Sequence, residues 1–124
     1  MYELCVKTHF AAAHQLAMVG EKCENLHGHN WRVEVRVAGP ALDEAGVLLD
    51  FGVLKKHVAA VMDDLDHKFL NELSAFSKKP PSSENIARYI ADRLAALLPV
   101  DKGVRVTSVT AWESENASAT YIPE

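Results

Sequence analysis

Three histidines near the start of the chain have a type and spacing that fit a metal site. His27 and His29 flank Gly28. Residues i and i+2 of an extended segment point to the same side, so both imidazoles can reach one ion. The glycine between them adds no side chain that would crowd the approach. With His14 as a third ligand, neutral imidazoles suit zinc and leave its fourth position open, as in catalytic sites. Spacing alone leaves surface or hydrogen-bonded histidines as the alternative.

Cys23 lies four residues before His27 and offers a thiol next to that metal site. A nearby cation shifts a cysteine toward the thiolate, which is the reactive form. Cys23 is therefore either a nucleophile or base beside an open site, or a fourth ligand that closes a structural site. Its charged and polar neighbours disfavour a buried, inert position. We expect Cys23 and Cys5 as free thiols, because the chain does not open with a secretory signal.

Three further residues are candidates for proton transfer or ligand binding. Asp66 and His67 are adjacent, and in a continuous helix they would point about 100° apart. A working Asp–His pair therefore requires the helix to end there, with the aspartate orienting the imidazole. The alternative is a histidine favoured by the dipole at a helix C-terminus. Glu113, at a strand end, can accept paired N–H donors from a heterocycle if it faces a pocket, and Glu115 is its rival.

The elements that position these residues follow from the hydrophobic pattern. Alternating residues predict strands at both ends of the chain, and apolar residues at three- and four-residue spacing predict two helices between them. Asp50 is the expected N-cap of the first helix, and Ser82 or Ser83 opens the second, which Pro99 ends. The predicted strands are residues 2–10, 30–38, 103–113 and 119–122.

The order β-β-α-α-β-β indicates the fold class. Hairpins joined by helices, without a βαβ crossover, predict an α+β domain with a four-stranded antiparallel sheet and both helices on one face. A single domain spans residues 1–124. Such a sheet has two open edges and one uncovered face, which favour pairing with further copies of the chain.

Composition excludes several classes of protein. The chain has 124 residues, of which 48% are hydrophobic, as in an ordinary globular domain. Acidic residues outnumber basic ones 17 to 13, for a net charge of -4, so binding to nucleic acid is disfavoured. No apolar run exceeds five residues, so no membrane partner is expected. We expect a cytoplasmic protein.

Several short motifs occur in a fixed order along the chain: Phe10-Ala11-Ala12-Ala13-His14, Cys23-x-x-x-His27-Gly28-His29-Asn30, Asp50-Phe51, Leu65-Asp66-His67, Pro81-Ser82-Ser83-Glu84-Asn85, Glu113 and Tyr121. This ordered set resembles the 6-pyruvoyl-tetrahydropterin synthase family over almost the whole chain. The position of Cys23 most resembles the branch that forms 6-carboxy-5,6,7,8-tetrahydropterin for queuosine biosynthesis. Gln15 departs from that branch, which often has a basic residue there.

The resemblance implies the tunnelling fold, in which trimers close their sheets into a β-barrel. Two trimers commonly stack into a homohexamer with active sites at subunit interfaces. It also implies a zinc-dependent lyase that converts 7,8-dihydroneopterin triphosphate to 6-carboxytetrahydropterin, acetaldehyde and triphosphate.

The resemblance further assigns roles to individual residues. His14, His27 and His29 would bind Zn²⁺, and Cys23 would accept a proton as thiolate. Asp66 and His67 would form a second proton relay, and Glu113 would anchor the pterin ring. Two alternatives stay open. One is a sister activity that forms 6-pyruvoyl-tetrahydropterin or feeds folate synthesis; the other is a zinc-stabilised binding module without turnover.

Overall fold

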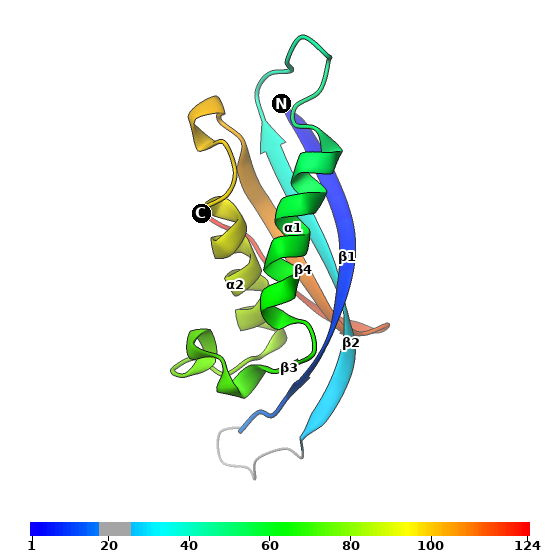
Figure 1. Ribbon diagram of the computed structural model, residues 1–124, viewed down its shortest axis with the longest axis vertical. Helices are drawn as coiled ribbons and strands as arrows, with labels where there is room; N and C mark the ends of the chain where they lie inside the picture. The colour runs from blue at the N-terminus through cyan, green and yellow to red at the C-terminus, as the bar shows by residue number, and fades with distance from the viewer. Residues whose placement is uncertain (18–25) are drawn as a thin grey trace.

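The computed structural model describes residues 1–17 and 26–124. In it, a twisted sheet is covered on one face by the helices α1 and α2, and its other face carries no helix (Figure 1). The main elements are β1 (Tyr2–His14), β2 (His27–Gly39), α1 (Phe51–Leu65), β3 (Lys68–Phe69), α2 (Ser83–Ala95), β4 (Arg105–Ser114) and β5 (Ala117–Tyr121). The described connections also contain the 3-10 helices η1 (Leu70–Glu72), η2 (Ser74–Phe76) and η3 (Val100–Lys102). The α+β class, the element order and the placement of both helices on one face are confirmed.

The sheet differs from the predicted four antiparallel strands. It has five strands in the order β3-β1-β2-β4-β5, and β3 runs parallel to β1. The four long strands pair antiparallel, as expected. β3 contains two residues, which is too short for an alternating pattern to reveal. It forms because the chain turns at His67 and returns beside the edge of β1.

The first hairpin is longer than predicted at the end that carries the histidines. β1 continues to His14 and β2 begins at His27, and these two residues form the last pair of the ladder. The sequence conceals this extension because the alanines before His14 do not alternate between apolar and polar. Pairing with the facing strand, rather than local propensity, holds the segment extended.

The predicted helix starts are confirmed in detail. Asp50 Oδ1 accepts a hydrogen bond from the N–H of Gly52 at 3.0 Å. Ser82 Oγ accepts one from the N–H of Asn85 at 3.2 Å. Each bond satisfies a backbone donor that has no partner inside its helix. α2 ends at Ala95, before Pro99, which instead precedes η3.

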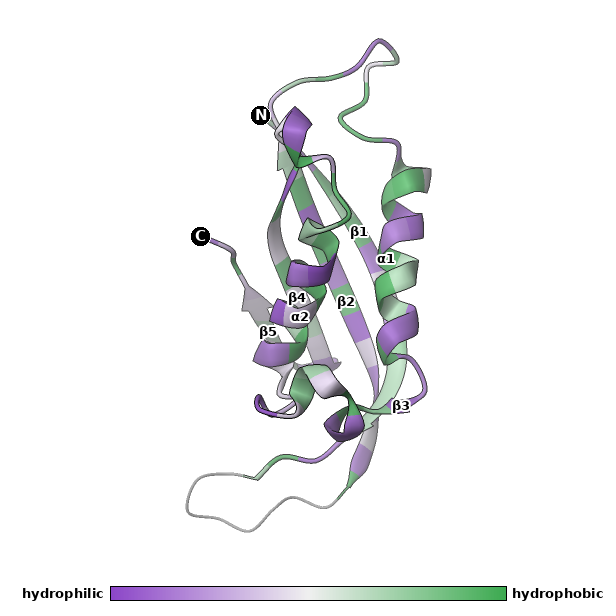
Figure 2. Ribbon diagram, turned by 60° about the vertical axis from the view of Figure 1, so that its left-hand side comes forward, coloured by the Kyte–Doolittle hydropathy of each residue, from purple (hydrophilic) through white to green (hydrophobic). Residues whose placement is uncertain are grey.

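Apolar side chains from the sheet and both helices form one core. β2 alternates between hydrophobic and hydrophilic residues along its length (Figure 2), so one set of its side chains faces the helices. Core members exposed by 1% or less include Phe10, Trp31, Val33, Val35, Leu54, Leu65, Ile86, Ile90 and Leu94. This core fixes which face of each strand is turned toward α1 and α2.

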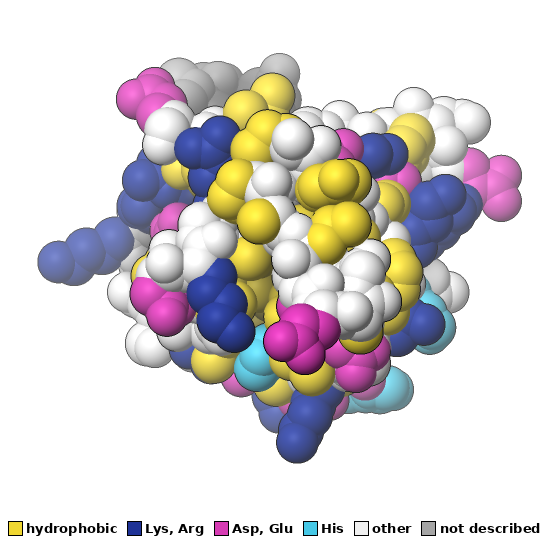
Figure 3. All heavy atoms as spheres, turned by 90° about the horizontal axis from the view of Figure 1, so that it is seen from above, with side chains coloured by type: hydrophobic (Ala, Val, Ile, Leu, Met, Phe, Trp, Pro, Cys, Tyr) yellow, Lys and Arg dark blue, Asp and Glu magenta, His cyan; other side chains and the backbone are white. Residues whose placement is uncertain are grey.

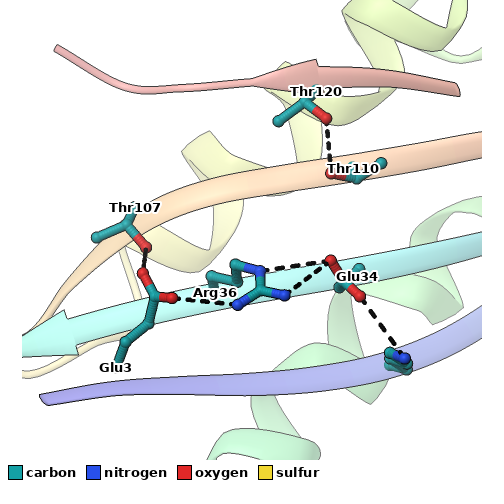
Figure 4. Close-up of polar contacts among 7 residues, drawn as sticks. Glu3, Glu34, Arg36, Thr107, Thr110 and Thr120 are labelled. Atoms are coloured by element: carbon teal, nitrogen blue, oxygen red, sulfur yellow. Dashed lines mark hydrogen bonds and ion pairs between the residues drawn. The ribbon is translucent and has the colours of Figure 1, made fainter.

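The uncovered face of the sheet is hydrophilic. Ion pairs and hydrogen bonds cross its strands (Figure 4), and they join Glu3, Lys7, Glu34, Arg36 and Thr107, with a separate Thr110–Thr120 contact. Exposed pairs of this kind each contribute little stability. Their chemistry shows instead that this face carries no second apolar core.

Viewed from above, the end of the molecule shows hydrophobic side chains gathered centrally with charged residues around them (Figure 3). Among the described residues, no helix has the length and apolar character needed to cross a bilayer.

Candidate metal centre

Four side chains from three strands converge at one end of the helix-covered face. His14 ends β1, His27 and His29 begin β2, and Glu113 lies near the end of β4. One ligand atom from each residue lies within 4.8 Å of all the others. His14 Nε2 and His27 Nε2 are 3.1 Å apart. The hairpin register explains this meeting, because His14 and His27 are cross-strand partners and His29 lies on the same face as His27.

His14 is oriented by a backbone carbonyl from another part of the chain. Its Nδ1 lies 2.7 Å from the carbonyl oxygen of Pro81, just before α2. A carbonyl oxygen only accepts, so Nδ1 carries the hydrogen and Nε2 presents its lone pair to the cluster. Metal-binding histidines usually have such an outer partner. The His14 ring, 1% exposed, also packs edge-on against Trp31.

Glu113 faces the three imidazoles. Its Oε1 lies 2.9 Å from His29 Nε2, 3.3 Å from His14 Nε2 and 3.8 Å from His27 Nε2. The register between β4 and β5 shifts between Trp112 and Ser114, so Glu113 lies at a bulge. Bulges change the direction of a side chain and are common beside active sites. The sequence analysis made a role for Glu113 conditional on its side chain facing a site, and the side chain does face the imidazoles.

The donor set fits a divalent metal ion that prefers imidazole. Ligand atoms about 2.0–2.1 Å from a tetrahedral zinc ion stand about 3.3 Å from one another, and the 3.1 Å between His14 Nε2 and His27 Nε2 is close to that value. His29 Nε2 is buried and forms no hydrogen bond of acceptable geometry, although Glu113 Oε1 is close. Burial lowers the pKa of His29, against the opposing effect of Glu113. A neutral imidazole nitrogen is the form that ligates a metal.

Asp66 and His67 form the pair that the sequence required a helix end to create. α1 ends at Leu65, Asp66 is extended, and His67 adopts a left-handed conformation with φ 58°. His67 Nδ1 then lies 2.9 Å from Asp66 Oδ2. Asp66 Oδ1 accepts from the N–H of Ala11 at 2.9 Å, and the N–H of His67 donates to the Ala11 carbonyl at 2.6 Å. The Ala11 N–H holds the pKa of Asp66 below its usual value, with a further contribution from His67.

This pair lies at the C-terminal end of α1, beside the edge of β1. Its contact residue, Ala11, comes three positions before His14, which is about 10 Å of strand. His67 is 82% exposed. Within one chain the Asp66–His67 pair therefore stands apart from the four side chains of the cluster, and its imidazole is open to a neighbouring molecule.

Cys23 falls outside the described residues. The structure shows contacts of two residues that the sequence did not predict. Pro81 acts through its main-chain carbonyl, and the Asn71 side chain bonds the main chain of Gln15. Contacts between residues this far apart in the chain leave no local pattern.

Known proteins share both the sequence and the fold. The 6-pyruvoyl tetrahydropterin synthase family matches residues 3–124. The 6-carboxy-5,6,7,8-tetrahydropterin synthase of Synechocystis sp. is 42% identical over 90 residues, which cover 68% of each chain. The dihydroneopterin monophosphate aldolase of Pyrococcus furiosus is 38% identical over 104 residues, 84% of this chain and 82% of that protein. The structure of 6-pyruvoyl tetrahydropterin synthase from Caenorhabditis elegans has a TM-score of 0.85 at 25% identity, covering 99% of this chain and 96% of that one.

The fold and the cluster define an α+β domain with one hydrophilic sheet face and a group of side chains able to hold a metal ion. The chain belongs to the 6-pyruvoyl tetrahydropterin synthase family, because that match runs through nearly all of it. The family resemblance carried by the sequence motifs is thereby confirmed.

Proposed function

We propose that this protein is a zinc-dependent pterin lyase. It converts 7,8-dihydroneopterin triphosphate and water to 6-carboxytetrahydropterin, acetaldehyde and triphosphate in queuosine biosynthesis, in the cytoplasm. The observation that carries the proposal is the convergence of His14, His27, His29 and Glu113 in a chain of this family. The similarity to a 6-carboxy-5,6,7,8-tetrahydropterin synthase supports the choice of product.

In this proposal the three imidazoles hold zinc. The ion supplies Lewis acidity toward hydroxyl groups of the substrate side chain. Glu113 anchors the pterin ring by accepting hydrogen bonds from the N–H donors of the ring. Because Glu113 lies beside the imidazoles, a ring bound there places the side chain of the substrate next to the metal. Glu113→Gln is expected to raise KM while the protein keeps its zinc. Loss of zinc in that variant would show that the carboxylate is a ligand instead.

Proton transfer falls to Cys23 and to the Asp66–His67 pair. Cys23 takes a proton as thiolate, which a neighbouring cation favours. Asp66 is kept anionic by the Ala11 N–H and orients the His67 imidazole through Nδ1. The outer Nε2 of His67 is then free to exchange protons as the substrate fragments leave.

The active enzyme is a homohexamer of two stacked trimers. β5 is one edge strand of the sheet, and β3 covers only Ala12 and Ala13 of β1 at the other edge. Open edges favour pairing between chains, which closes three sheets into a barrel with the hydrophilic face inside. The exposed His67 of one chain then serves the metal cluster of another.

A second candidate is an aldolase acting on dihydroneopterin monophosphate. It is favoured by the similarity to the Pyrococcus furiosus aldolase and by Gln15, an uncharged residue where a basic one would assist a triphosphate. Pyruvoyl-forming synthases are a third outcome on the same fold.

The test is product identification. The zinc-loaded protein is incubated separately with dihydroneopterin triphosphate and with the monophosphate, and products are identified by mass spectrometry. Carboxytetrahydropterin with acetaldehyde from the triphosphate supports the proposal. Turnover of the monophosphate alone supports the aldolase, and tight zinc binding without turnover supports a binding module.

The role of Cys23 is tested by Cys23→Ala. If the thiol is the base, zinc content stays at the wild-type level while turnover falls by about 10²–10⁴-fold. Cys5→Ala is the matched control and keeps full turnover. Loss of zinc from Cys23→Ala would identify the thiol as a fourth ligand and overturn the open site.

A further inference from the structure

The residue after His14 is bound at both of its main-chain polar groups by one side chain. Asn71 Oδ1 accepts from the N–H of Gln15 at 2.9 Å, and Asn71 Nδ2 donates to the Gln15 carbonyl at 2.8 Å. These two bonds copy the way a neighbouring strand residue would pair with Gln15. We call this arrangement the Asn71 clamp.

The clamp stands where strand pairing ends. The ladder with β2 stops at His14, and the ladder with β3 stops at Ala13. Gln15 therefore lies beyond both ladders. The Asn71 clamp supplies hydrogen bonds to the main chain just after β1, past the last β1–β3 pair. His14 is the residue immediately before Gln15.

Asn71 is well anchored for this task. It lies in η1 directly after Leu70, which is fully buried in the core. The N–H of Leu73 closes the same turn by donating to the Leu70 carbonyl at 3.1 Å. A primary amide carries a donor and an acceptor on one group, so it can pair with both the N–H and the C=O of one residue. Aspartate lacks the donor, and alanine lacks both.

His14 is thus held from two directions. Pro81 fixes its ring through Nδ1, and the Asn71 clamp fixes the main chain that follows it. Gln15, Asn71 and Pro81 also line one pocket of about 270 Å³, so the two restraints belong to the same part of the molecule.

We propose that Asn71 is a positioning residue for the metal ligand His14: its two hydrogen bonds to Gln15 hold His14 Nε2 in register with the other imidazoles. The inference rests on the metal centre of the proposed function. Asn71 is not among the four side chains of the cluster, so it acts through the histidine that it places.

The experiment measures metal binding by the whole protein rather than activity. Wild type, Asn71→Ala, Asn71→Asp and Ser77→Ala are titrated with Zn²⁺ against a chromophoric chelator, and with Co²⁺ by visible absorption. Ser77 is the matched control, because its hydroxyl bonds the Ser74 carbonyl in the same pocket wall without touching Gln15. Loss of an outer-shell partner typically costs about 10–100-fold in metal affinity, and that loss is expected for Asn71→Ala.

The cobalt spectrum separates positioning from general stability. At saturating Co²⁺, Asn71→Ala is expected to show an altered band shape and Ser77→Ala the wild-type spectrum. Asn71→Asp provides the same reading if Asn71→Ala does not fold. Wild-type affinity and spectrum in a folded Asn71 variant would overturn the inference alone. Failure of the wild type to bind either metal would overturn the proposed metal centre, and the inference with it.

Discussion

The histidine cluster and the Asp66–His67 pair are held in place in different ways. The cluster draws its four side chains from three strands and lies on the helix-covered face, with His14 buried. The pair consists of consecutive residues at a helix end, attached to the edge of β1 through both main-chain groups of Ala11. Its imidazole is largely exposed.

This difference indicates which region is complete within one chain. The cluster brings together, within one chain, four side chains that could hold a metal ion. The pair has its internal hydrogen bonds satisfied, but the working side of its imidazole points outward. A second chain can bring a substrate and a metal to that exposed ring. Four predictions test this contrast, and the one with the greatest expected loss comes first.

Replacing one histidine of the cluster should abolish metal binding. His27→Ala is expected to lose zinc, with a fall in affinity beyond the about 100-fold that outer-shell changes produce, and to lose turnover with it. Metal content by atomic spectroscopy and product formation measure both effects. His57→Ala is the control, because His57 lies on α1 and not in the cluster. Full zinc occupancy in His27→Ala would contradict the ligand assignment.

Replacing the exposed imidazole should leave the metal in place. His67→Ala is expected to keep wild-type zinc and to lose about 10²–10⁴-fold in turnover, the contribution of a general acid or base.

Mixing then tests whether the two regions of different chains work together. Unfolded His27→Ala and His67→Ala chains are refolded as a mixture and assayed against each variant refolded alone. Restored turnover is expected, because some sites then combine an intact cluster with an intact pair. A mixture no more active than its components would place both regions in one chain's site.

The smallest effect concerns the charge of Asp66. Its pKa is lowered in the folded protein, so the carboxylate contributes stability that is present above its unfolded pKa, about 3.8. That contribution is lost as pH falls through the folded value. The stability difference between metal-free wild type and Asp66→Asn should therefore be constant near neutrality and shrink below about pH 4. Denaturant midpoints at several pH values measure it; a difference that grows on acidification would contradict the assigned shift.

Much of the fold could be predicted from the sequence because the signals for it are local. Asp50 and Ser82 cap their helices as predicted, since a cap needs only a side chain and the next turn of backbone. The two-residue strand β3 was not readable, because it exists only where the chain after His67 meets the edge of β1. The extension of β1 to His14 was missed for the same reason.

The spacing of His27 and His29 is enough to predict that they share a side of one strand, because residues i and i+2 of an extended segment point the same way. The ordered motifs likewise predict the family. The direction of Glu113 toward the imidazoles at a bulge, and the contacts of Pro81 and Asn71 with His14 and Gln15, appear in the folded chain alone. Those contacts join residues distant along the chain, through hydrogen bonds to main-chain atoms or through strand register. Neither main-chain hydrogen bonds nor strand register produces a pattern of residue types or spacings that could be recognised in the sequence.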